Sequence, residues 1–325
     1  MSKIIYSLGL ILFGLLLGYG VQVLVDQRRL SLPISTERLR KLLQRIALLF
    51  LNPVAIVGAV WVVNIESIGI AALPFVGFFA LLAGGVVALG FARLLQLEPK
   101  KAGAMFCCGS FTNIGSIGAL ICFVFLGEAG FALVPIYKLF EEVSYYSIGF
   151  PIARLYSGSG IVDSSVSERL KGLARDPFII VAVSSIALGG LLNWSGLPRP
   201  AFYQSLISVF VPLGTIMLLA SIGLALRFRR VRDYVRESVS VAAIKFLIVP
   251  ACATSAAHLI GFGNLDGGLP LKVVMVLSAM PVAFNALIPP SIYDLDLDLA
   301  NSCWFVTTAS LVLVLPLLLL ILNSF

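Results

Sequence analysis

Ten apolar stretches, each of roughly twenty residues, follow one another along the chain. Twenty residues suffice for an α-helix to cross a hydrocarbon core of about 30 Å, because a helix rises about 1.5 Å per residue. Apolar residues make up 59% of the 325 and charged residues only 12%, which excludes a soluble globular domain. We predict an all-α integral membrane protein with ten transmembrane helices, called stretches one to ten, at Ile4–Val25, Leu42–Val63, Ile68–Leu95, Ala102–Leu126, Ala129–Ile152, Phe178–Leu197, Phe202–Leu226, Ser238–Ile260, Leu269–Ile292 and Leu297–Ile321. A re-entrant Phe178–Leu197 would reduce the number of spans.

Lys and Arg residues gather in the loops that follow stretches one, three, five and seven, at residues 28–45, 93–101, 154–175 and 227–236. Cytoplasmic loops of membrane proteins carry an excess of these residues. The loops are therefore predicted to be cytoplasmic, which places both termini on the extracytoplasmic side. This distribution also explains the net charge of +7, and no nucleic-acid motif accompanies it.

The longest polar connection divides the ten stretches into five and five. An odd number in each half makes the second half enter the membrane in the opposite sense. If the halves share a fold, they are inverted repeats, an arrangement common in secondary transporters. The predicted organisation is a first five-helix repeat at 1–155, a cytoplasmic connecting loop at 156–176 and a second repeat at 177–325.

Stretches four and nine carry polar and helix-breaking residues in their middle. Stretch four contains GSFTNIGSIG at 109–118, and stretch nine contains Pro281 and Asn285, followed by Pro289 and Pro290. Lipid offers no hydrogen-bond partners, so such segments indicate a helix broken around a cavity, or else a close contact between helices through small residues. Proline also removes a backbone donor, which favours a discontinuous stretch nine.

The depth of two asparagines supports a shared site. Asn113 lies 12 residues past Lys101, and Asn285 lies 13 residues past Lys272. At helical rise these separations are about 18 to 20 Å. Because the two stretches enter from opposite faces, both amides fall near the middle of the bilayer.

Residues 109–118 with FLGEAG at 125–130, and residues 279–286, resemble the fourth-helix and ninth-helix signatures of the auxin efflux carrier family. The resemblance implies a secondary transporter of two inverted five-helix repeats. Helices four and nine would cross as broken helices beside a substrate cavity, as in bile acid:sodium symporters. Bacterial members are permeases for malate, malonate and similar organic anions, which implies a bacterial inner membrane as the location. Homodimerisation is expected from the resemblance alone.

The chain departs from the family pattern in stretch four. It has Ser110 where the family often has Asn, and it lacks the family's proline near Ile117. We therefore expect Gly115 and Gly118 to interrupt this helix.

An anionic substrate needs hydrogen-bond donors, which broken half-helices supply through exposed backbone N–H groups. We expect Asn113 and Asn285 to line the cavity, unless their amides only join helices. The other candidates for substrate binding are Ser110, Thr112, Ser116 and Pro281, together with Asn52, whose place before Pro53 also has a structural explanation as a kink.

Stretch five contains three charged residues, Lys138, Glu141 and Glu142. Each charge near the bilayer centre costs on the order of 3 kcal/mol unless it is paired or faces water. Lys138 is three and four residues from the two acids, so it can neutralise one of them. We hypothesise that one carboxylate takes up a proton during transport; the alternative is a static ion pair. In stretch eight, Lys245 is expected to reach the cytoplasmic interface, and His258 to lie at the surface.

These features predict a secondary transporter of a small organic anion, coupled to protons or to sodium ions, or to neither. The alternative is sodium-coupled uptake of a bulkier amphipathic acid. An enzyme is not expected, because HExxH and GxSxG motifs are absent from the sequence, and no loop is long enough for a sensor's soluble output domain. Five unpaired cysteines and one histidine predict no metal site and no cofactor.

Overall fold

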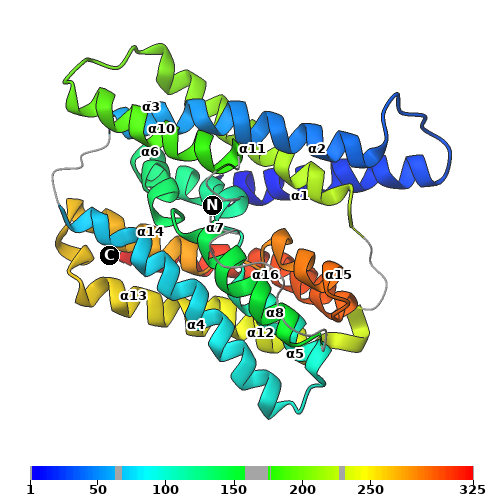
Figure 1. Ribbon diagram of the computed structural model, residues 1–325. Helices are drawn as coiled ribbons and strands as arrows, with labels where there is room; N and C mark the ends of the chain where they lie inside the picture. Colours follow the sequence, from blue (N-terminus) through cyan, green and yellow to red (C-terminus); the bar gives the residue numbers. More distant parts are fainter. Residues whose placement is uncertain (1, 63–67, 158–174, 176, 227–230, 325) are drawn as a thin grey trace. The chain divides into compact units, whose positions relative to one another are not determined.

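The structure is a computed structural model (Figure 1) and describes residues 2–62, 68–157, 175, 177–226 and 231–324. Within these ranges the chain is helical, and its only β-type contact is an isolated bridge between Thr112 and Val282. The all-α prediction is therefore confirmed for the described residues. Most of the predicted connecting loop at 156–176 lies outside them.

The chain forms two compact units, and each takes segments from both halves of the sequence. Unit 1 comprises Met1–Asn64, Gly115–Pro135 and Pro177–Arg227, and unit 2 comprises Ile65–Ile114, Ile136–Asp176 and Phe228–Phe325. The helices of unit 1 are α1 (Ser2–Asp26), α2 (Thr36–Ile46), η1 (Ala47–Leu51), α3 (Asn52–Val62), most of η3 (Ile114–Gly118) and of α6 (Ala119–Tyr137), α10 (Pro177–Trp194) and α11 (Phe202–Gly223), where η marks a 3-10 or π turn.

Unit 2 contains the remaining described helices. They are η2 (Ile68–Ala72), α4 (Leu73–Leu94), α5 (Pro99–Ser110), α7 (Glu141–Ser144), η4 (Tyr145–Gly149), α8 (Phe150–Leu155), η5 (Val231–Tyr234), α12 (Val235–Ala243), η6 (Ile244–Ile248), α13 (Val249–Leu259), η7 (Phe262–Asn264), η8 (Asp266–Gly268), α14 (Leu269–Ser278), η9 (Phe284–Leu287), α15 (Ile288–Ile292) and α16 (Leu297–Ser324).

Eight of the described helices are long and apolar enough to cross a membrane. The difference from the predicted ten comes from stretches four and nine, because α5 has only 12 residues and α14 only 10 before each is interrupted. The boundary between stretches four and five falls at Gly127, whose φ of 74° breaks α6. Ten spans and an inverted repeat stay predictions.

Small residues allow the helices of unit 1 to pack closely. Gly14 and Gly18 of α1 face α11, where a Cβ at Gly14 would lie 2.8 Å from Leu219 Cβ, and one at Gly18 would overlap the carbonyl of Ala220. Gly189 of α10 similarly faces Val60 of α3. Transmembrane backbones approach in this way where glycine removes the side chain from the contact.

Glycines also join α4 and α5 in unit 2. A Cβ at Gly84 would overlap the carbonyl of Gly109, and a Cβ at Gly109 would overlap Ala88. Because Gly109 comes one residue before the end of α5, this contact lies directly before the interruption that follows.

Three π turns precede prolines. The segments η1, η4 and η6 each end two residues before a proline, at Pro53, Pro151 and Pro250. A proline ring clashes with the carbonyl four residues earlier, and in all three cases that carbonyl lies inside the π turn. The wider turn relieves the clash without ending the helix, so these stretches remain continuous.

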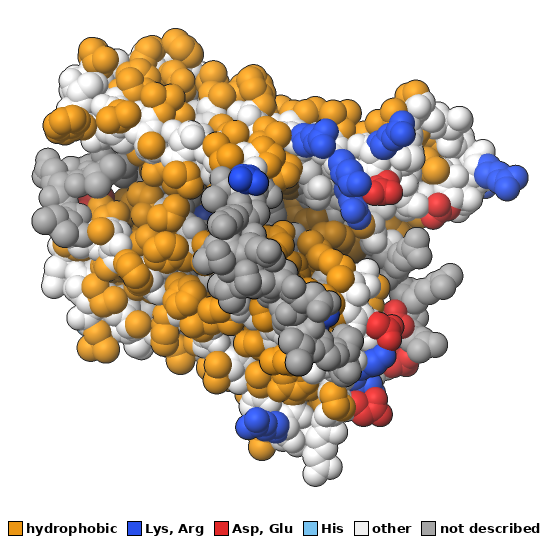
Figure 2. Space-filling model, viewed as in Figure 1, with side chains coloured by type: hydrophobic (Ala, Val, Ile, Leu, Met, Phe, Trp, Pro, Cys, Tyr) orange, Lys and Arg blue, Asp and Glu red, His pale blue; other side chains and the backbone are white. Residues whose placement is uncertain are grey.

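The face drawn in Figure 2 carries mostly apolar side chains. Val86 of α4, Leu247 of η6 and Leu313 of α16 are each at least two-thirds exposed. An exposed apolar surface of this extent indicates contact with lipid, which supports a multi-pass membrane protein.

Candidate functional site

Two helix interruptions of unit 2 are paired with each other. Helix α5 ends at Ser110 and the chain continues in extended form at Phe111; α14 ends at Ser278 and helical structure resumes at Phe284. The N–H of Asn113 donates to the carbonyl of Pro281 at 2.9 Å, and the N–H of Ala283 donates to the carbonyl of Phe111 at 3.0 Å. These two bonds form the Thr112–Val282 antiparallel bridge.

The pairing explains how both helices are interrupted among apolar residues. Breaking a helix frees backbone N–H and C=O groups, which cost several kcal/mol each in hydrocarbon if they remain unsatisfied. Each interruption satisfies part of the other, and the N–H of Val282 also donates to the hydroxyl of Thr307 at 3.2 Å. The expectation that Gly115 and Gly118 break stretch four is wrong: the break lies at residues 111–113, before both glycines, which belong to the π turn η3.

The side chain of Lys245 ends at the first interruption. Its ammonium donates to the hydroxyl of Thr112 at 2.7 Å and to the carbonyl of Ser110 at 3.4 Å, and the side chain is fully buried. The expectation that Lys245 reaches the cytoplasmic interface is therefore wrong. The π turn η6 contains Lys245 and inserts one extra residue, which changes the helix face to which the side chain points.

A second chain of polar contacts reaches Thr112 from stretch five. The hydroxyl of Tyr145 accepts from the N–H of Thr112 at 3.2 Å and donates to Glu141 Oε1 at 2.8 Å. The other oxygen of Glu141 pairs with Lys138 Nζ at 3.0 Å. Tyr145 also stacks on Phe111, with ring centroids 3.9 Å apart. Lys138, Glu141, Tyr145, Thr112 and Lys245 thus form one continuous polar chain within unit 2.

The structure brings some predicted site residues together and describes others elsewhere. Ser110, Thr112, Asn113 and Pro281 lie in or beside the paired interruptions, and all four are buried. Asn285 lies in η9 and is exposed. Ser116 and Asn52 belong to unit 1, where the side-chain amide oxygen of Asn52 lies beside Gly214 of α11. Lys138 pairs with Glu141, one of the two acids that it was predicted to be able to neutralise.

Two residues of the polar chain were absent from the predicted site, and both left a signal in the sequence. Tyr145 lies four residues after Glu141, the spacing at which side chains meet on one helix face. Lys245 lies five residues before Pro250, inside an apolar stretch, and intramembrane charges are functional candidates by default. Lys245 was predicted to lie at the interface because a long, flexible lysine side chain can reach the interface from within a span.

The loop after stretch three, predicted to be cytoplasmic, meets the loop after stretch nine in unit 2; the alternation of the spans places this second loop on the same side, although it is acidic and not basic. Lys100, after stretch three, pairs with Asp294, after stretch nine, at 2.5 Å. In the same loop, Asp296 accepts from the hydroxyl of Tyr234 at 2.9 Å and from the N–H of Leu299 at 2.9 Å, which caps the start of α16. The contacts require these loops to lie on one side of the membrane, in agreement with the predicted alternation of the spans; the identity of that side stays a prediction.

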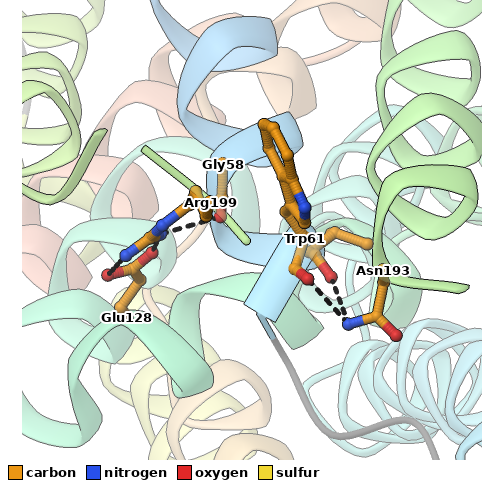
Figure 3. Close-up of polar contacts among 6 residues, drawn as sticks. Gly58, Trp61, Glu128, Asn193 and Arg199 are labelled. Atoms are coloured by element: carbon orange, nitrogen blue, oxygen red, sulfur yellow. Dashed lines mark hydrogen bonds and ion pairs between the residues drawn. The ribbon is translucent and has the colours of Figure 1, made fainter. Parts of the chain in front are cut away.

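Segments that the alternation places on the other side meet in unit 1. Figure 3 shows Arg199 between Glu128 and the carbonyl of Gly58, with which it makes an ion pair and a 2.8 Å hydrogen bond. Asn193 donates to the carbonyl of Trp61 at 2.8 Å. The amide of Asn193 thus satisfies a carbonyl in the last turn of α3, where carbonyls have no intrahelical partner.

These features define an all-helical, multi-pass membrane protein whose interrupted helices are paired beside buried charges. No protein-family model matches the chain. It is similar to an uncharacterized transporter of Methanothermobacter thermautotrophicus, 25% identical over 252 residues that cover 77% of this chain and 78% of the relative. It is also similar to an uncharacterized transporter of Methanocaldococcus jannaschii, 27% identical over 249 residues that cover 75% and 77%. The resemblance to auxin efflux carriers stays a prediction.

Proposed function

We propose that this protein is a secondary transporter of small organic anions that works by alternating access around the paired interruptions of stretches four and nine. The observation that carries the proposal is the Thr112–Val282 bridge and its two flanking hydrogen bonds. Irregular backbone at membrane depth is tolerated where it is enclosed by protein or lines a cavity, and discontinuous helices form the substrate sites of many secondary transporters. The names of both relatives, each an uncharacterized transporter, point to the same class.

The packing of the helices supports the proposed ten spans and inverted repeats. If stretch six corresponds to stretch one, and seven to two, then the contact of α1 with α11 corresponds to that of α10 with α3. Both contacts occur, and glycines mediate each of them. In unit 2 the contact of α4 with α5 corresponds in the same way to that of α13 with α14. A twofold relation between the halves accounts for all these pairs.

The proposed site holds an acid through neutral donors. Asn285 presents an exposed amide in η9, and Asn113 and Thr112 lie at the partner interruption. Side-chain amides bind a carboxylate without the permanent ion pair that would slow its release. Ser116 and Asn52 remain candidate ligands on the basis of the sequence.

The polar chain supports coupling to protons. Glu141 is 6% exposed and touches both Lys138 and Tyr145, and Tyr145 in turn touches Thr112 at the interruption. A proton gained by Glu141 would weaken its pairing with Lys138 and change the bonding of Tyr145. Protonation at one end of the chain therefore alters the contacts of the interruption itself.

Uptake by purified protein in proteoliposomes tests the transport proposal. Labelled malonate and malate are supplied with a pH gradient, a sodium gradient or neither, and protein-free vesicles are the control. Uptake that accumulates with the pH gradient supports the proposal, and uptake that requires sodium supports the bile-acid-type alternative. If the full protein moves none of a panel of mono- and dicarboxylates, the proposed function is wrong.

Two matched variants test the proton carrier. We expect Glu141→Gln to flatten the dependence of uptake on pH, because the amide cannot exchange a proton. Glu142→Gln removes a neighbouring charge and is expected to keep the wild-type profile. An unchanged profile in both variants would exclude a carboxylate carrier in stretch five.

A further inference from the structure

The first interruption presents acceptors of the kind that bind cations. Ser110 is the last residue of α5, so its carbonyl lies at the negative end of the helix dipole. The hydroxyl of Thr112 is two residues further on and donates to the same carbonyl at 3.4 Å. In transporters with discontinuous helices, unwound carbonyls and helix C-terminal ends coordinate the coupling ion.

In this chain the acceptors are already bonded to a cation. Lys245 Nζ is 2.7 Å from the hydroxyl of Thr112 and 3.4 Å from the carbonyl of Ser110, and the residue is 0% exposed. We propose that the ammonium of Lys245 is a tethered cation that occupies the ion site of the interruption in place of sodium.

The surroundings of Lys245 fit this role. The nearest acid in the polar chain, Glu141, is separated from Lys245 by Tyr145 and Thr112. The ammonium is therefore held by a hydroxyl and a carbonyl, and not by a direct ion pair with the carboxylate of Glu141. A hydroxyl and a carbonyl are also the ligands that a bound sodium ion would have here.

The inference deepens the proposed function and rests on it where transport is concerned, because a site filled by the protein's own ammonium leaves no place for sodium at this interruption. Wild-type uptake is then equal in sodium and in choline media of the same ionic strength. The proposed binding of the Lys245 ammonium at the ion site predicts an effect on protein stability, which is tested without a substrate.

Chemical rescue tests the site. Lys245→Ala removes four atoms that n-propylammonium replaces, whereas Lys245→Met fills the same space without a charge. We expect Lys245→Ala to melt at a lower temperature than the wild type, and n-propylammonium chloride, compared with equal choline chloride, to raise its melting temperature. The wild type and Lys245→Met are expected to show no such difference. Adding Thr112→Val to Lys245→Ala should abolish the rescue.

Two results would overturn the proposal. One is an equal effect of n-propylammonium on Lys245→Ala and Lys245→Met, which would mean that no cation site opens. The other is a higher melting temperature or faster uptake of the wild type in sodium than in choline, which would mean that sodium binds as well. If wild-type vesicles take up no anion, the transport proposal fails, while the melting experiments still decide the role of Lys245.

Discussion

The ammonium of Lys245 and the hydroxyl of Thr112 lie 2.7 Å apart and join a π turn of one helix to the interruption of another. Both residues are buried. A buried charge is stable only when its hydrogen bonds are made, so the interruption and the lysine depend on each other. Thr112 also binds Tyr145 through its N–H, which places this threonine at the junction of the polar chain.

Removing the hydroxyl of Thr112 should destabilise unit 2. Thr112→Val keeps the shape of the side chain but leaves Lys245 with one protein acceptor of those described, the carbonyl of Ser110. Hydrogen bonds to charged groups are worth about 1.5–3 kcal/mol, and we expect a loss of this order in thermal or denaturant unfolding in detergent. Thr215→Val is the control and should cost less, because the hydroxyl of Thr215 donates to the carbonyl of Val211 in its own helix and not to a charged group of the described residues.

A double-mutant cycle separates this interaction from packing. With Lys245→Met in the background, Thr112→Val should cost little, so the coupling free energy should account for most of the single-variant loss. Equal costs in the two backgrounds would show that the contact between the two side chains does not stabilise the protein.

The hydroxyl of Tyr145 is expected to matter more than its ring. Tyr145→Phe keeps the stacking on Phe111 but leaves the N–H of Thr112 and an oxygen of Glu141 without this partner. A buried donor that loses its partner costs about 1–3 kcal/mol. The neighbouring Tyr146→Phe, at a residue 38% exposed, should change the unfolding free energy by less than half of that. Similar losses in both variants would contradict the assigned role of the Tyr145 hydroxyl.

The ion pair between Lys100 and Asp294 should give a salt-sensitive dependence of stability on pH. The hydrogen bond and charge of Lys100 lower the pKa of Asp294. A lowered pKa stabilises the folded state above the ordinary aspartate value of about 4, and the contribution is lost as the pH falls through the lowered pKa. The melting temperature of the wild type should therefore exceed that of Asp294→Asn at about pH 6 and approach it below about pH 3.

Asparagine is a suitable replacement because Asp294 has a φ of 52°, a conformation that Asn also adopts readily. The pair is exposed, so about 0.5 M salt should reduce the difference. A difference that persists at low pH would indicate a cause other than the charge of Asp294.

The sequence predicted most helices because their apolar length is a local property. Stretch ten, predicted at Leu297–Ile321, is α16 at Leu297–Ser324. The interruption of stretch nine was also predictable, since Pro281 lies inside it and acts on its own backbone. In stretch four, by contrast, residues 111–113 leave the helix through hydrogen bonds to residues 281 and 283, which are distant in sequence. No local rule places that break.

The position of Lys245 was missed for a related reason. In a regular helix the period sets the direction of each side chain. The π turn before Pro250 inserts one extra residue, which turns the side chains on one side of it toward another face of the helix. The same proline that causes the π turn was visible in the sequence. A proline five residues after a polar side chain in an apolar stretch, as Pro250 is after Lys245, therefore indicates that this side chain points to another face of the helix.

The contact of α1 with α11 should depend on one glycine and not on its neighbour. A Cβ at Gly18 would overlap the backbone carbonyl of Ala220, whereas one at Gly20 has open space. Forcing a methyl group into a packed contact costs about 1–3 kcal/mol, while alanine for glycine at an open helical position gains about 0.5–1 kcal/mol. We expect Gly18→Ala to lower the melting temperature in detergent and Gly20→Ala to leave it unchanged or raise it slightly. Both variants add the same methyl group to the same helix, so a similar response in both would mean that α1 does not pack on α11 through Gly18.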